Sequence, residues 1–159
     1  MKSSKLSDLL QLGQSPWYDN LDRRLIENGQ LQTLFELGVT GVTSNPSIFE
    51  KAVNGSDVYD GRIKDHGQGG AATLDIYHAI TISDVQSAAD MLSDIYTDSQ
   101  GKDGYVSLEV LPELAYDSEK TVRDAKDIWE RVARPNLMIK VPGTKEGYAA
   151  IKELTKEGI

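Results

Sequence analysis

The chain has 159 residues, of which 39% are hydrophobic and 26% charged, and its formal net charge at pH 7 is −8. This length and balance are typical of one globular domain, and the acidic excess argues against nucleic-acid binding, which depends on neutralising phosphates. The sequence has no cysteine, which excludes disulfides and cysteine-ligated metals, and only two histidines, His66 and His78, too few for a histidine-rich metal site.

The N-terminal stretch MKSSKLSDLLQL predicts an amphipathic helix rather than a signal peptide, because Asp8 interrupts its apolar run. No segment of the chain reaches the ~18 consecutive apolar residues that a membrane span requires. With no export signal and no cysteine, we expect a cytoplasmic protein that does not contact a membrane.

Helical periodicity separates four short apolar runs along the chain. Residues 22–37 predict two short helices with a break at Gly29, and residues 71–96 predict two more, because Ser83 and Gln86 have the spacing of a capping box. The runs themselves are bounded by Gly or Pro and predict β-strands. They cover residues 15–21, 38–45, 105–112 and 136–143.

Two helices are predicted after the third strand. One has four apolar residues on a single face and is closed by Pro135; the four are Val122, Ala125, Trp129 and Val132. The last begins at the N-cap Thr144 and ends near Glu157, with Gly158 at its C-cap. Its inward residues are expected to be Ala150, Ile151 and Leu154. The GQGG sequence at residues 67–70 predicts a loop.

The predicted order is therefore β-α-β-α-β-α-β-α, with a helical insertion at about residues 50–100. Strands that alternate with helices indicate an α/β protein with a parallel sheet. We expect residues 1–159 to form a single domain.

Each predicted strand has one mainly apolar face and a polar residue on the other face, near its C-terminal end. Trp17, Asp19 and Leu21 share a face, as do Gly41, Thr43 and Asn45, because side chains two apart point the same way. The four polar residues are Asp19, Asn45, Glu109 and Lys140. In a (β/α)8 barrel such inward residues build the active site, so their convergence predicts barrel-type chemistry.

Lys140 lies in the apolar sequence LMIKVPG. Burial lowers the pKa of a lysine toward neutrality, and a neutral amine attacks carbonyls to form Schiff bases. Glu109 and Asp19 are candidate acid and base groups for such chemistry. The residues alone leave open a structural lysine that is paired with Glu109 or simply emerges at the strand end, and an exposed Asp19 in a turn. Asn45 is expected to cap a helix that begins at Pro46, and in addition to face the pocket.

Four segments resemble the transaldolase family, in the order in which that family has them. GVTSNPSIF at 41–49 resembles the family's second-strand signature, and LMIKVPGTKEG at 137–147 resembles its Schiff-base lysine segment. VSLEV around Glu109 and WYDNL around Asp19 are similar to the two remaining catalytic segments. The resemblance spans nearly the whole chain and is closest to the longer bacterial transaldolases.

The resemblance implies a (β/α)8 TIM barrel and a Schiff-base transfer between sugar phosphates, without metal or organic cofactor. Lys140 would be the nucleophile toward the keto group, and Asp19 would take the proton from the C4 hydroxyl of the donor. Glu109 would act as acid and base around the Schiff base through a bound water. Asn45, with Thr43, would orient the donor hydroxyls.

A complete barrel of this type needs about 250 residues. Only four βα units are predicted, so the chain is expected to be the N-terminal half of a transaldolase, with the phosphate contacts beyond Ile159. Alone it is expected to be weakly active or inactive, and to self-associate through its exposed half-barrel edges. The alternatives are another class I aldolase and a non-catalytic half-barrel module.

Overall fold

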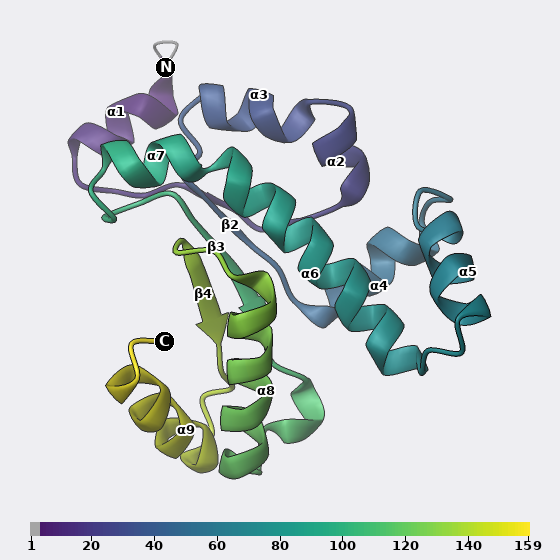
Figure 1. The fold of residues 1–159 in the computed structure, drawn as a ribbon. Helices are drawn as coiled ribbons and strands as arrows, with labels where there is room; N and C mark the ends of the chain where they lie inside the picture. Colours follow the sequence, from purple (N-terminus) through teal and green to yellow (C-terminus); the bar gives the residue numbers. More distant parts are fainter. Residues whose placement is uncertain (1–3) are drawn as a thin grey trace.

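Four parallel strands form one sheet in the computed structural model, which describes residues 4–159 (Figure 1). The strands follow the chain order, β1-β2-β3-β4, so β1 and β4 are the edges. Their bounds are β1 Trp17–Tyr18, β2 Gly41–Thr43, β3 Tyr105–Glu109 and β4 Leu137–Lys140. The predicted α/β class and parallel sheet are confirmed. The strands are shorter than the predicted runs, most of all the first.

The helices lie before, between and after the strands, as predicted. Before β2 they are α1 Lys5–Gln11, α2 Arg23–Glu27 and α3 Gln30–Glu36. Between β2 and β3 they are α4 Pro46–Asn54, α5 Asp60–Gln68, α6 Thr73–Met91 and α7 Ser93–Asp98. After β3 come the 3-10 turn η1 Pro112–Leu114, then α8 Ser118–Val132 and α9 Lys145–Lys156. None of these helices has the length and apolar content that crossing a bilayer takes, within the described part of the chain.

Local sequence signals set several helix ends. Gly29 adopts φ +76 between α2 and α3, which confirms the predicted break there, since this left-handed conformation suits glycine. The Asn45 side chain accepts a hydrogen bond from the Ile48 N–H at the start of α4, and Thr144 accepts one from the Gly147 N–H at the start of α9. Both predicted N-caps are confirmed.

Three details of the predicted helices are wrong. Helix α6 continues through Ser83, because the Ser83 hydroxyl accepts hydrogen bonds from Arg23 and Arg62 instead of capping a new helix. The break comes later, at Leu92. Helix α5 extends to Gln68, so only the end of GQGG is a turn. Ile151 on α9 is 40% exposed rather than inward.

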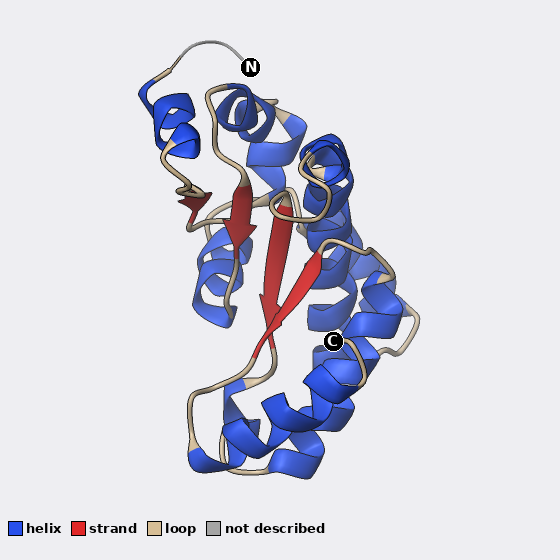
Figure 2. Cartoon of the chain, turned by 90° about the vertical axis from the view of Figure 1, so that its left-hand side faces the viewer, coloured by secondary structure: helices blue, strands red, loops and turns tan. Residues whose placement is uncertain are grey.

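One face of the sheet packs against helices and forms the core (Figure 2). Val106, Leu108 and Val110 of the third strand segment point to this side and are buried, as their alternation predicts. The buried cluster around them includes Val42, Val85, Ala88, Ala125, Ile128, Val132 and Leu137. The apolar stripes of α6 and α8 therefore hold the sheet from one side.

On the opposite face of the sheet, Trp17 of β1 packs against Gly41 of β2. The indole of Trp17 lies so close to Gly41 that an added Cβ would sit 2.3 Å from the ring, so the second strand needs glycine here. Trp17, Asp19 and Leu21 do not share one environment as predicted. The strand stops at Tyr18, Asp19 is exposed, and Leu21 is fully buried.

A buried polar network ties α2 to α6. Arg23 forms an ion pair with Asp84, and the Tyr59 hydroxyl donates to Asp84 at 2.7 Å while accepting from the Arg23 backbone N–H at 2.8 Å. Burial and the neighbouring Asp84 charge raise the pKa of Tyr59, which keeps the phenol protonated as the donor. This network fixes the helices between β2 and β3 against the start of α2.

Candidate active site

Two charged residues of neighbouring strands meet at the C-terminal end of the sheet. Glu109 of β3 and Lys140 of β4 are register partners, and the Glu109 Oε2 lies 3.2 Å from the Lys140 Nζ. The two side chains are 24% and 37% exposed, respectively. They share the face opposite the helix-packed core, as the alternation of residues along both strands predicts.

The Lys140 side chain is not buried, because more than a third of it is exposed, as expected for a lysine that emerges at the strand end. The sheet ends at β4, so no further described strand covers this side of the lysine. What surrounds the ammonium instead is a set of oxygen acceptors.

Lys140 donates to the second strand as well as to Glu109. Its Nζ lies 3.0 Å from the Ser44 carbonyl oxygen and 3.4 Å from the Thr43 Oγ1. An ammonium has three N–H donors, and each has one acceptor here. The amine is therefore held at a fixed place above the sheet, between β2 and β3.

Two serines that the sequence analysis did not single out as site residues support these acceptors. The Ser107 hydroxyl donates to the Thr43 Oγ1 at 2.8 Å, and the Ser44 hydroxyl donates to the Ser107 carbonyl oxygen at 2.7 Å. Both serines are buried, at 3% and 0% exposure. The signal for Ser107 was its position two residues before Glu109 on the same face. No sequence signal could identify Ser44, because Lys140 contacts its backbone carbonyl oxygen, a group that every residue has.

Asn45 and Asp19 lie at the same end of the sheet, and among the described residues neither forms a hydrogen bond or ion pair with Lys140. Asn45 is half-buried, and its side-chain oxygen caps α4. Asp19 follows β1 directly and is exposed, and its side chain has no ion pair or hydrogen bond within residues 4–159. The structure therefore brings together Thr43, Glu109 and Lys140, and places the other two predicted site residues beside this group.

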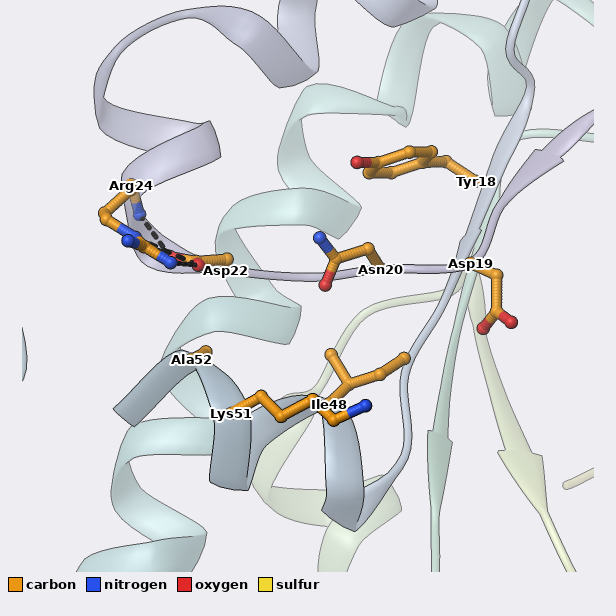
Figure 3. A pocket seen from close by; sticks show the side chains of 8 residues that line it. All are labelled: Tyr18, Asp19, Asn20, Asp22, Arg24, Ile48, Lys51 and Ala52. Atoms are coloured by element: carbon orange, nitrogen blue, oxygen red, sulfur yellow. Dashed lines mark hydrogen bonds and ion pairs between the residues drawn. The ribbon is translucent and has the colours of Figure 1, made fainter. Parts of the chain in front are cut away.

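A hollow of about 450 Å³ adjoins Asp19, between the segment after β1 and helix α4 (Figure 3). Tyr18 and Asn20 lie on one side of it, and Ile48 and Lys51 of α4 lie on the other. The Asp19 side chain points away from that of Asn20. This volume falls in the range of small-molecule sites.

Negative charge gathers behind the site. Burial, together with the negative charges of Glu109, Asp124 and Glu113, raises the pKa of Tyr77 on α6 to about 12. The Tyr77 ring packs edge-on against Phe49 of α4, and its hydroxyl is buried without a hydrogen-bond partner among the described residues. Residues 4–159 contain no group of three His, Cys, Asp or Glu side chains placed to hold a metal ion.

Catalytic residues of α/β barrel enzymes come from the C-terminal ends of their parallel strands, which is where Lys140 and Glu109 lie. A comparison with protein families agrees and is more specific. The family model for "Transaldolase/Fructose-6-phosphate aldolase" matches residues 16–159. The chain belongs to this family, which is of the TIM-barrel aldolase class.

Curated relatives are similar over almost the entire chain. A "Transaldolase" of Thiobacillus denitrificans is 47% identical over 153 residues, which cover 96% of this chain and 43% of the relative. "Transaldolase 2" of Nostoc punctiforme is 41% identical over 160 residues, covering 100% of this chain and 42% of the relative. A "Transaldolase" of Saccharopolyspora erythraea is 44% identical over 158 residues, covering 99% and 43%. The chain thus spans less than half the length of these relatives.

Proposed function

We propose that residues 1–159 are the N-terminal half of a transaldolase, a single domain that supplies the first four βα units of the barrel, with the helices at about 50–100 as an insertion. Its function is the transfer of a dihydroxyacetone unit between sugar phosphates in the pentose phosphate pathway of the cytoplasm. The family match and the curated relatives support this assignment. The observation that carries it is the contact of Lys140 with Glu109, inside the segment that resembles the family's Schiff-base lysine.

The donor is a ketose phosphate, sedoheptulose 7-phosphate or fructose 6-phosphate. The Lys140 amine, after giving a proton to Glu109, attacks the keto carbon to form a carbinolamine. Glu109, through a bound water, returns a proton to the departing hydroxyl, and loss of water leaves the Schiff base. Their separation of 3.2 Å suits this exchange of protons.

Carbon–carbon cleavage needs a base at the other end of the donor. Asp19 takes the C4 hydroxyl proton as the C3–C4 bond breaks, the aldose phosphate leaves, and the bond's electron pair stays in an enamine on Lys140. Thr43 and Asn45 orient the donor hydroxyls. The enamine then attacks the aldehyde of glyceraldehyde 3-phosphate or erythrose 4-phosphate, and hydrolysis of the new Schiff base frees Lys140.

The chain alone is expected to be weakly active at most. Phosphate contacts in such barrels often follow the seventh and eighth strands, which have no counterpart among the four strands described. A donor would therefore be held mainly through its reacting end. Sugar phosphates would bind loosely to this chain and react slowly.

The half-reaction of the donor tests the proposal, because it needs no acceptor. We expect the chain with fructose 6-phosphate to release up to one equivalent of glyceraldehyde 3-phosphate slowly. Lys140→Arg should abolish this release, whereas Lys145→Arg, on the exposed start of α9, should retain it. Release by the Lys140→Arg variant would contradict the proposed role of Lys140, and no release by any form would favour the alternative of a non-catalytic half-barrel module.

A second candidate function, association with another copy through the sheet edges, is favoured by one observation. A groove of about 250 Å³ follows the edge strand β4 and is lined by Ile139, Val141, Ile151, Leu154, Thr155 and Ile159. Unpaired strand edges beside apolar surface favour pairing with a second chain. Gel filtration combined with the donor assay separates the two functions, since a stable dimer without any release of product would support a non-catalytic module.

A further inference from the structure

The segment that carries Asp19 is fixed at both of its ends. On one side it leaves the sheet, where Tyr18 of β1 pairs with β2. On the other side the chain becomes buried at once, since Leu21 is 0% exposed and Asp22 is 5% exposed. Figure 3 shows the chain running in an extended stretch from Asp19 past Asn20 to Asp22. Asp19 and Asn20 therefore lie directly between the two fixed points.

A buried tyrosine between α4 and α5 holds the far end of this segment. Tyr59 immediately precedes α5 and is 0% exposed, and its hydroxyl accepts a hydrogen bond from the Arg23 backbone N–H at 2.8 Å. Arg23 is the first residue of α2, so this N–H has no acceptor within its own helix. Without the Tyr59 hydroxyl it would be a donor with no partner in a buried place.

The Tyr59 hydroxyl is itself held in one orientation. It donates to the Asp84 Oδ2 at 2.7 Å, and Asp84 of α6 is 0% exposed and paired with the Arg23 guanidinium. A hydroxyl that donates its one proton to a carboxylate presents a lone pair to its second partner. Asp84 and Tyr59 thus fix the Arg23 backbone against α6.

We propose that Tyr59 is a positioning residue for Asp19, the base of the proposed carbon–carbon cleavage. This role rests on the proposed function, and Tyr59 is not among the site residues that the transaldolase resemblance implies. The Asp19 side chain has no hydrogen bond or ion pair within the described residues, so the backbone on either side places its carboxylate. A base must lie within hydrogen-bond reach of the proton it removes, and a small displacement costs much of the rate. The helices between β2 and β3 thereby contribute to the reaction without contacting the substrate.

Borohydride reduction of the chain with fructose 6-phosphate provides the test, because the trapped adduct reports how far the reaction has gone. An uncleaved donor leaves a fructose 6-phosphate adduct on Lys140, and a cleaved donor leaves a lighter dihydroxyacetone adduct. Tyr59→Phe removes only the hydroxyl. We expect it to raise the ratio of uncleaved to cleaved adduct, at a fixed short time, by about tenfold or more, with the total adduct per folded chain unchanged. Asp19→Asn should raise this ratio further.

The matched control is Tyr105→Phe, which also removes a tyrosine hydrogen bond but at the N-terminal end of β3. There the Tyr105 hydroxyl donates to the Gly101 carbonyl oxygen at 2.6 Å. This variant should keep the adduct ratio of the parent chain. A loss of stability alone lowers both adducts together and leaves their ratio unchanged.

Amide hydrogen exchange measures the anchoring without any reaction. In the parent chain the Arg23 amide should exchange as slowly as the buried Val85 amide of α6, and in Tyr59→Phe at least about tenfold faster relative to Val85. An unchanged adduct ratio in Tyr59→Phe, or a parent Arg23 amide that exchanges like an exposed one, would overturn the positioning role. If the parent chain forms neither adduct, the proposed function fails, and the exchange of the Arg23 amide still decides whether Tyr59 anchors this segment.

Discussion

Glu109 and Lys140 stand opposite each other on neighbouring parallel strands, with 3.2 Å between the carboxylate oxygen and the amine. Both side chains are partly open to water, so the ion pair contributes little to stability. In the proposed mechanism the contact gives Lys140 a base at hydrogen-bond distance, while Thr43 and Ser44 accept its other protons.

Replacing Glu109 by Gln removes the charge and keeps the shape. We expect the free energy of unfolding to change by less than about 1 kcal/mol, because the pair is partly exposed. Adduct formation at Lys140 should slow by about 100-fold or more, as is usual when an acid–base group is lost. Urea unfolding measures the first quantity, and mass spectrometry of reduced adducts over time measures the second.

Glu113→Gln is the matched control for this variant, because Glu113 is an exposed carboxylate of η1 four residues further along. Glu113→Gln should leave the free energy of unfolding and the rate of adduct formation at Lys140 unchanged. A Glu109→Gln chain that forms the adduct at the parent rate would show that Glu109 is only an ion-pair partner of Lys140.

Ser107 positions Thr43, which in turn accepts from Lys140. Ser107→Ala should lower the free energy of unfolding by about 1 kcal/mol, the usual net value of such a hydrogen bond. Adduct formation per folded molecule should fall several-fold, because the amine loses a fixed acceptor. The control is Ser93→Ala, at the exposed start of α7, which should change neither the free energy of unfolding nor the rate of adduct formation. A loss of stability with an unchanged adduct rate would assign Ser107 a purely structural role.

Gly41 and Gly143 differ sharply in the space around them. A methyl group on Gly41 would meet the Trp17 indole at 2.3 Å, whereas one on Gly143 would have no neighbour within 4 Å. We expect Gly41→Ala to destabilise the chain by about 1–3 kcal/mol through overpacking. Gly143→Ala should change stability by less than about 0.5 kcal/mol. Urea midpoints measure both, and equal midpoints for the two variants would contradict the packing of Trp17 on β2.

Tyr77 makes stability depend on alkaline pH. Burial, together with the negative charges of Glu109, Asp124 and Glu113, raises its pKa to about 12 in the folded chain, above the ordinary value near 10 in the unfolded chain. The unfolded chain therefore releases this proton first. The free energy of unfolding should fall as pH rises from 10 toward 12, by up to about 1.4 kcal/mol per pH unit for this group.

Tyr77→Phe removes that dependence. At pH 7 the variant should be as stable as the parent or slightly more stable, because the buried hydroxyl has no partner among the described residues. Urea unfolding at pH 8, 10 and 11 should show a shallower decline for the variant. Identical declines for both chains would place the Tyr77 hydroxyl in contact with water.

Local sequence signals were sufficient to predict much of this fold. Gly- and Pro-bounded runs identified the four strands, and Asn45 and Thr144 marked the starts of α4 and α9. The predicted helix start at Ser83 was wrong because a capping box is a local pattern. The Ser83 hydroxyl instead accepts hydrogen bonds from Arg23 and Arg62, which are distant in sequence. Such long-range contacts leave no periodic trace in the sequence.

Local patterns also predicted part of the candidate site, but not the features that depend on distant parts of the chain. Alternation along β3 and β4 placed Glu109 and Lys140 on one face, and parallel pairing brought them into contact. The exposure of Lys140 could not be predicted from its apolar neighbours, because it depends on what lies beside an edge strand. The hydrogen bond between Tyr59 and the Arg23 backbone had no signal either, since only the fold brings these two residues together.

The most direct test of the central claim is reduction with borohydride in the presence of fructose 6-phosphate, followed by intact mass measurement and peptide mapping. The account predicts one dihydroxyacetone-derived adduct per chain, located on Lys140 and absent from Lys140→Arg. The Lys145→Arg control should carry the same adduct as the parent. A chain of confirmed mass that forms no adduct, or that carries it on lysines other than Lys140, would contradict Lys140 as the Schiff-base nucleophile.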